Sequence, residues 1–148
     1  MTEPTIAPPA ADEHAPFYAG YIAGVSGTDV LGLLRRQPAA LRAACAGLRD
    51  DEARHRYAPG KWSVKEALGH VCDTERVMAY RLLRFSRGDA TPVPGFEQDS
   101  YVRAAGFDDR TVEELLRSSM RCAPQRSLWC GTSPPSSSRD GAWPAVRR

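Results

Sequence analysis

The stretch from residue 63 to residue 88 constrains the fold of this chain more than any other. Ser63 and Glu66 have the spacing of a capping box, in which each side chain accepts a hydrogen bond from an amide at a helix start. Apolar residues then recur at intervals of three and four, and Gly88 is typical of the position after a helix end. The sequence therefore predicts one long helix over Val64–Arg87. Its apolar stripe consists of Val64, Leu68, Val71, Met78, Leu82 and Phe85.

Shorter patterns predict further helices on both sides of this one. An apolar periodicity predicts a helix from Asp29 to Leu48, with a kink or break just before Pro38 because proline lacks the backbone donor. A short helix is expected at Gln98–Ala105, after an irregular, proline-rich crossover. Thr111 and Glu114 form a second capping box, which begins a helix of about ten residues. The fold class is therefore all-α, an up-and-down helical bundle.

The two ends of the chain differ in composition from its middle. Residues 1–16 contain four prolines and no periodicity, which predicts a disordered tail. The helical domain is expected over residues 17–117, with the apolar segment Phe17–Val25 laid on the core. Residues 118–148 are rich in Ser, Pro and Arg and show no periodicity, so we expect an irregular tail. A fourth helix is not recognisable.

Composition excludes several classes of function. The 148 residues carry a formal net charge of +2, which gives little attraction for nucleic acid. No run of about 18 apolar residues is present, so a membrane helix is not expected. The four cysteines form no CxxC pair, and we interpret them as reduced thiols of a cytoplasmic protein. No nucleotide-binding, zinc-protease or serine-nucleophile motif occurs.

Among the three histidines, only His70 lies on the long predicted helix. At about 100° per residue it shares a face with Thr74, Val77 and Arg81, at the border of the core. A structural or solvated histidine is one interpretation of this position. Metal ligation or proton transfer is the other. Cys72 points away from His70 on the same helix, which disfavours cysteine–histidine catalysis.

Two acidic residues of the same helix are further candidates. Glu75 falls on the apolar stripe, where a carboxylate must be paired or neutralised. It is either a general base within a polar network or the partner of an arginine from a neighbouring helix. Asp73 lies two residues earlier, and most charges around it are expected to face solvent.

One run of residues resembles the DinB-like superfamily. The run reads PGKWS…LGH…DTER over Pro59–Arg76, and residues 91–99 and 107–110 resemble one branch of the same family. The resemblance covers about residues 17–116. It implies a four-helix bundle, often dimeric, in which many members bind a divalent metal through three histidines.

The resemblance also implies roles for particular residues. His70 corresponds to the first metal ligand, for Zn or Ni, with Glu75 or Asp73 in support. The other two ligands of the family form an HxxxH pair on the fourth helix, and this sequence has no histidine after His70. Relatives with complete sites include thiol transferases that use mycothiol or bacillithiol and a maleylpyruvate isomerase. This implies a metal that activates a low-molecular-weight thiol and a small-molecule substrate.

Two functional hypotheses follow from the resemblance and the missing ligands. The first is a metal-dependent thiol transferase or hydrolase, impaired here because two ligands are absent. The second is a non-catalytic, truncated helical bundle with a structural or homodimerisation role. For residues 118–148 we expect either a shifted reading frame of a GC-rich gene or a natural tail, and sequencing the DNA in all frames distinguishes them. No nucleic-acid or membrane partner is expected.

Overall fold

A computed structural model describes residues 7–25, 27 and 29–130 of the chain, with side chains up to residue 122. Within these ranges the chain forms helices and contains no strand, which confirms the all-α prediction. None of the described helices combines the length and hydropathy that crossing a bilayer requires. The α-helices are α1 (Ala19–Val25), α2 (Val30–Ala44), α3 (Val64–Ser86), α4 (Gln98–Ala105) and α5 (Val112–Cys130). The short 3₁₀ turns are η1 (Pro16–Tyr18), η2 (Glu52–Arg54) and η3 (Phe107–Asp109).

Helix α3 begins and ends as its sequence predicts. The Glu66 amide donates to the Ser63 hydroxyl over 3.0 Å, and the Ser63 amide donates to the Glu66 carboxylate over 2.7 Å. The helix ends at Ser86, and Gly88 has a φ of +69° in the left-handed region that favours glycine. The capping box therefore fixes the start of the longest helix of the bundle.

Helix α2 starts as expected but ends early. The Asp29 carboxylate caps it by accepting from the Gly32 amide over 2.9 Å. The helix continues through Pro38, so the break considered there is absent. It ends at Ala44, four residues before the predicted end, because the chain turns through Gly47 at a φ of +78°.

Helix α5 is longer than the ten residues predicted for it and continues past residue 117. The Ser118 hydroxyl accepts a hydrogen bond from the Arg76 guanidinium over 2.7 Å, and Ser119 is buried. The packed face of α5 therefore includes the small polar side chains of Ser118 and Ser119. An apolar pattern does not identify such residues, which is why the predicted helix was too short. The remainder of the predicted tail, residues 131–148, lies outside the described residues.

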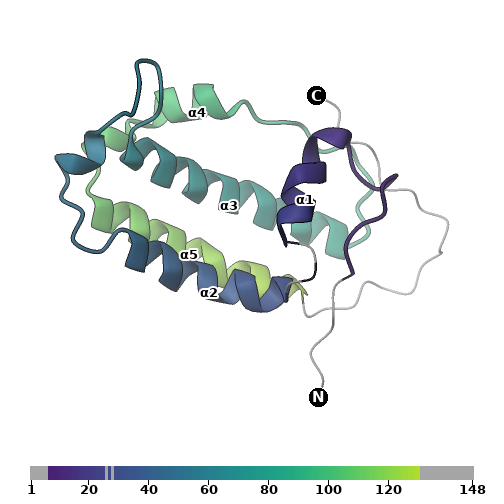
Figure 1. Ribbon diagram of the computed structural model, residues 1–148. Coiled ribbons are helices and arrows are strands. Elements are labelled where there is room, and N and C mark those ends of the chain that lie inside the picture. Colours follow the sequence, from purple (N-terminus) through teal and green to yellow (C-terminus); the bar gives the residue numbers. More distant parts are fainter. Residues whose placement is uncertain (1–6, 26, 28, 131–148) are drawn as a thin grey trace.

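The helices lie in the order α4, α3, α5, α2 across the molecule (Figure 1). Helix α5 packs against both α3 and α2, and it provides the main connection between those two helices in the described part of the chain. Helices α3 and α5 run in the same direction, since the connection through α4 returns the chain to the starting end of α3. Three contacts set this register: Ser63 with Asp108, Cys72 with Leu115, and Arg76 with Ser118.

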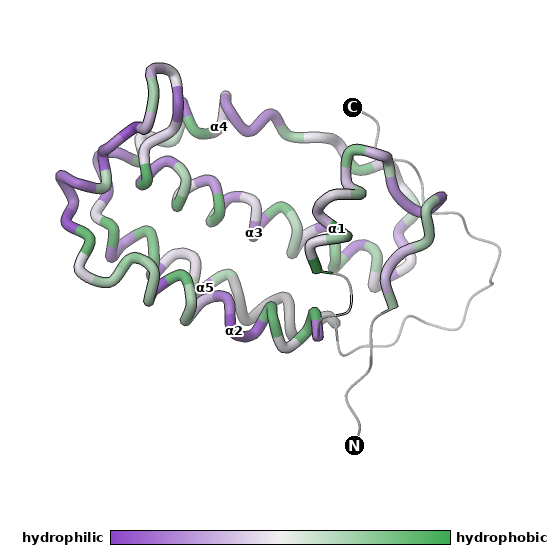
Figure 2. Tube along the Cα trace, in the orientation of Figure 1, coloured by the Kyte–Doolittle hydropathy of each residue, from purple (hydrophilic) through white to green (hydrophobic). Residues whose placement is uncertain are grey.

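The hydrophobic core gathers at the end of the bundle where α3 and α5 begin. Hydrophobic residues occur along both α2 and α3 (Figure 2). The buried core cluster nevertheless lies at this end. Gly69 lets the ring of Phe107 lie directly on α3, in space that a Cβ atom would occupy. The buried cluster consists of Ala53, Leu68, Val112, Leu115 and Leu116.

The apolar segment before α2 does not pack on the core, which contradicts the sequence prediction. No residue of η1 or α1 is buried, and Phe17 and Tyr21 are 62% and 70% exposed. The rings instead contact each other, with the Phe17 centroid 5.2 Å from that of Tyr18 and 5.9 Å from that of Tyr21. The periodicity of this segment carried no information about which surface the segment contacts.

Candidate functional site

His70 lies on the second turn of α3 and contacts two aromatic rings. The Trp62 ring, just before the helix cap, has its centroid 4.8 Å from that of the imidazole. The Phe96 ring stacks on the imidazole at 6.4 Å with an interplanar angle of 27°. Because both neighbours are aromatic, the half-buried imidazole is held by packing against these two rings.

The polar neighbour of His70 is one helical turn further along α3. The Thr74 hydroxyl lies 3.4 Å from Nε2 of the imidazole, a long hydrogen bond whose direction depends on the tautomer. On the same face, Arg81 donates from Nη2 to the Pro94 carbonyl over 2.9 Å. This contact holds the crossover that carries Phe96 against α3. The predicted shared face of His70, Thr74 and Arg81 is therefore confirmed.

Aromatic contacts continue from His70 onto α4. The Phe96 ring meets the Tyr101 ring edge-to-face at 5.3 Å. The four rings of Trp62, His70, Phe96 and Tyr101, here called the aromatic row, come from two loops and two helices. Sequence reasoning missed Phe96 as a neighbour of His70. The proline-rich crossover was the available signal, because prolines fix a loop in one conformation.

The structure does not bring the three predicted site residues together. Asp73 forms an ion pair with Arg76 on its own helix, at 3.3 Å. Glu75 is partly buried, with its Oε2 atom withdrawn from solvent. At about 100° per residue, position 75 points about 140° away from position 70, whereas position 73 is a neighbour of position 70 on the helix surface. The support roles of Asp73 and Glu75 stay predictions.

The side chains present do not fit the metal site that the family resemblance implies. Across the described residues, no three His, Cys, Asp or Glu side chains gather where they could hold a metal ion. The other two histidines are His14, whose ring nitrogen lies 3.1 Å from the Ala15 carbonyl, and the exposed His55. Zinc sites use three or four protein ligands, so one imidazole is a weak site.

The described cysteines are free thiols, and two of them lie in the core or pack against it. Cys72 is buried and donates from Sγ to the Leu115 carbonyl over 3.3 Å. Burial raises the pKa of the Cys72 thiol, and burial likewise raises the pKa of the Cys45 thiol. Cys45 packs against the core cluster. The prediction that these two residues serve as small core residues is therefore confirmed.

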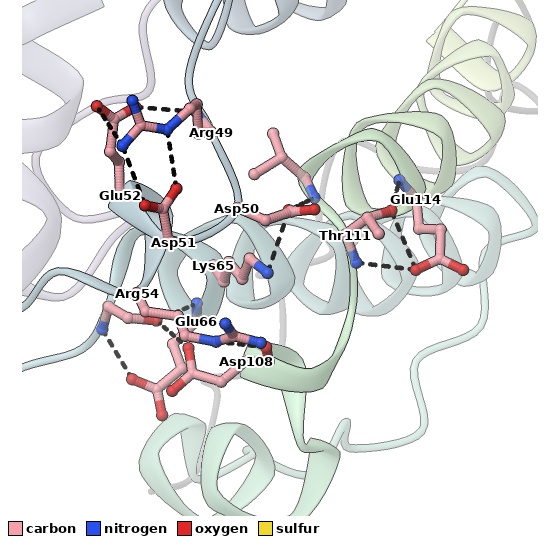
Figure 3. Close-up of polar contacts among 12 residues, drawn as sticks. Arg49, Asp50, Asp51, Glu52, Arg54, Lys65, Glu66, Asp108, Thr111 and Glu114 are labelled. Carbon is pink, nitrogen blue, oxygen red and sulfur yellow. Dashed lines mark hydrogen bonds and ion pairs between the residues drawn. The ribbon is translucent and has the colours of Figure 1, made fainter.

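A charged network lies beside the core at the same end of the bundle (Figure 3). Arg56 forms ion pairs with Asp108 at 2.6 Å and with Glu66 at 2.9 Å. The buried Ser63 hydroxyl donates to Asp108 over 2.6 Å. Burial works to raise the pKa of Asp108, but the hydrogen bonds from Ser63 and Arg56 outweigh it and lower that pKa. The network holds η3 against the N-terminal cap of α3. Its charged groups are paired with one another.

An open groove of about 460 Å³ lies between the end of α2 and the start of α5. Its charged groups are already paired: Arg42 with Glu113 at 3.2 Å and Arg49 with Asp51 at 3.0 Å. Cys45 and Leu116 contribute to its lining. With its cations neutralised, the groove has no evident group for an anionic ligand.

Comparison with known proteins identifies the family of this bundle. The sequence profile of the DinB superfamily matches residues 33–126. A protein of Geobacillus thermodenitrificans (strain NG80-2) named "Putative metal-dependent hydrolase" is 28% identical over 86 residues, 58% of this chain and 48% of the relative. The chain thus spans about half the length of that curated relative. No solved structure matches the chain. Because the profile covers more than half of its residues, the chain belongs to the DinB superfamily.

Proposed function

We propose that this chain is an impaired member of the metal-dependent branch of its superfamily, related to thiol transferases and hydrolases. The observation that carries the proposal is the surroundings of His70, which are the Trp62 and Phe96 rings and the Thr74 hydroxyl. The relative named for a metal-dependent hydrolase supports the branch. On this proposal a small-molecule substrate and a low-molecular-weight thiol belong to complete members, and no catalytic step is assigned to this chain.

Metal affinity is the property that tests this proposal. A single imidazole does not hold Zn²⁺ or Ni²⁺ firmly, because both ions need several ligands at once. We therefore expect the full chain to bind these ions weakly, with an affinity that His70→Ala leaves unchanged. Titration of the purified chain against a chromogenic chelator measures this. His55→Ala is the matched control, because its imidazole is exposed.

Two outcomes of the titration contradict the proposal. Binding of one metal ion per chain that is tight and is lost in His70→Ala would mean that the site is complete. Binding of one ion per two chains that depends on His70 would mean that a second copy supplies the missing ligands. Weak binding that His70→Ala leaves unchanged, whether or not His55→Ala weakens it, is surface association and supports the proposal.

The alternative function is a non-catalytic bundle that acts through homodimerisation. Specific observations support it: Val71 and Met78 on the apolar stripe of α3 are 38% and 44% exposed. Exposed apolar side chains on one face of a helix are compatible with an interaction site. Sedimentation of the full chain over a concentration series tests the role, and a monomer at every concentration would exclude it. The cytoplasmic location stays a prediction.

A further inference from the structure

We propose that residues 92–97, here called the cover, control access to the imidazole of His70 by local opening. The cover belongs to the crossover between α3 and α4. The structure shows it closed, with the Phe96 ring stacked on the imidazole at 6.4 Å. The cover is independent of the proposed function, because it concerns the imidazole of the chain without a metal ion.

The cover starts from a fixed point on α3. Arg84 donates from Nε to the Asp89 carboxylate over 2.6 Å and from Nη2 to the Thr91 carbonyl over 3.0 Å. The Thr91 amide donates to the same carboxylate over 2.9 Å. The Arg84 side chain is only 11% exposed, so water competes little for this charge-assisted pair. Residues 89–91 therefore stay on α3 when the segment after them moves.

The hydrogen bond that holds the cover to α3 comes from Arg81. Its Nη2 atom donates to the Pro94 carbonyl over 2.9 Å. The Nε atom of the same guanidinium is withdrawn from solvent, and it has no acceptor within the described part of the chain. A buried donor without an acceptor costs free energy, and water relieves that cost once it reaches the atom. Because the guanidinium lies against the cover, the closed position includes this cost and the open position does not.

Few apolar side chains fasten the cover and the helix that follows it. Val93 is buried in the cover, and Val102 is the buried residue of α4. Helix α4 lies on the outer side of α3, at the edge of the bundle (Figure 1). The next firm contact along the chain is the Phe107 ring on Gly69. Segments with few buried apolar contacts open at a lower free energy than the whole domain, and the stretch between Thr91 and Phe107 is such a segment.

Opening changes the surroundings of His70 on one side only. The Trp62 ring, 4.8 Å from the imidazole, directly precedes the capping box of α3 and stays in place. The Phe96 ring leaves with the cover. A small solute that contacts the imidazole on this side must therefore compete with the closed state, which lowers its apparent affinity. The cover is thus an autoinhibitory contact within the chain.

The reactivity of His70 tests the proposal. Diethyl pyrocarbonate acylates imidazole nitrogens that it can reach, and peptide mass spectrometry gives a separate rate for each histidine. The reaction is run on the full chain at one pH with a chelator present, so that no metal ion shields the ring. We expect Phe96→Ala to raise the His70 rate at least about fivefold. The rate of the exposed His55 should stay unchanged.

Tyr57→Ala is the matched control for the loss of an aromatic ring. Tyr57 is 77% exposed and lies in the loop before α3, so this variant should leave the His70 rate unchanged. Circular dichroism of each variant verifies that the helices form. Equal His70 rates in the wild type and in a folded Phe96→Ala chain would overturn the cover.

Urea distinguishes local opening from two other routes to His70 and needs no variant. The His70 rate of the wild type, divided by the His55 rate, is measured at urea concentrations below the unfolding transition. Its slope reports the surface exposed in the reactive state. Local opening predicts a slope above zero and well below the m value of global unfolding. A slope equal to m would mean that His70 reacts only in the unfolded chain, and a slope of zero that it reacts in the closed structure. Either result would overturn the proposal.

Discussion

The Nζ atom of Lys65 lies 3.1 Å from Oδ1 of Asp50, and the same oxygen accepts the backbone amide of Val112 over 2.8 Å. The lysine side chain is 1% exposed, so this carboxylate compensates the cost of burying the ammonium group. Asp50 itself is half-exposed and comes from the connection between α2 and α3 (Figure 3). One carboxylate therefore joins that connection, the first turn of α3 and the start of α5.

Removal of the carboxylate should harm the fold more than removal of the lysine charge. Asp50→Ala leaves the buried ammonium without this partner and the Val112 amide without its acceptor. Lys65→Met removes the buried charge and leaves Asp50 in contact with water. We expect Asp50→Ala to lower Tm by several degrees and Lys65→Met to lower it less, as measured by circular dichroism. The reverse order would contradict the arrangement.

The Asp50 carboxylate should also make stability depend on pH. The hydrogen bond from the Val112 amide, followed by that from Lys65, lowers the pKa of Asp50 below its ordinary value of 3.8. A pKa lowered by folding stabilises the protein above the unfolded value, and this contribution is lost as the pH falls through the folded value. We expect the Tm difference between wild type and Asp50→Asn to be constant above about pH 5 and to shrink below about pH 4.

The comparison with Asp50→Asn isolates one group. Other carboxylates, including Asp108, also have lowered pKa values and contribute equally to both proteins. A Tm difference that grows on acidification would show that the Asp50 pKa is raised by folding.

Gly69 should not tolerate a side chain. A Cβ atom at this position would meet the ring of Phe107, which packs directly on α3. We expect Gly69→Ala to lower the free energy of unfolding by about 1–3 kcal/mol, measured by urea denaturation. Gly20→Ala is the control, because no atom lies within 4 Å of a Cβ there and alanine favours a helix. Adding Phe107→Ala to Gly69→Ala should give less than the sum of the two losses, and full additivity would disprove the contact.

His70 should be replaceable by a ring without nitrogen. Its aromatic contacts are the Trp62 and Phe96 rings, which a phenyl group also satisfies, and its polar contact is one long hydrogen bond with Thr74. His70→Phe should change the free energy of unfolding by less than about 1 kcal/mol, whereas His70→Ala should lose about 1 kcal/mol or more. Urea denaturation with and without added Zn²⁺ measures both. If added Zn²⁺ stabilised the wild type but not His70→Phe, this would instead indicate that the imidazole binds the ion.

Local sequence signals predicted the parts of the fold that depend on neighbouring residues. The capping boxes of Ser63 and Thr111 begin α3 and α5, and α4 has the predicted bounds. Each signal works because the interacting groups are three or four residues apart. The face shared by His70 and Thr74 follows from the same geometry.

Features that depend on distant residues were not predicted. Phe96 reaches His70 from a crossover more than twenty positions away, which periodicity does not encode. Ser119 is buried, and its burial depends on how the helices pack, which the apolar pattern of one helix does not encode. The segment Phe17–Val25 has the pattern of a core-facing helix, but amphipathicity states only that a partner is needed. Which surface supplies that partner is decided by the tertiary arrangement.

Because the buried cluster gathers where α3 and α5 begin, the two ends of the bundle differ in cohesion. We expect amide hydrogens near Leu68 and Leu115 to exchange with solvent only when the whole domain opens. Those near the other end of α3 should be released by partial openings that leave the cluster intact. The end of α3 near Met78 and Phe85 should thus rearrange while the end that carries the family motif stays folded.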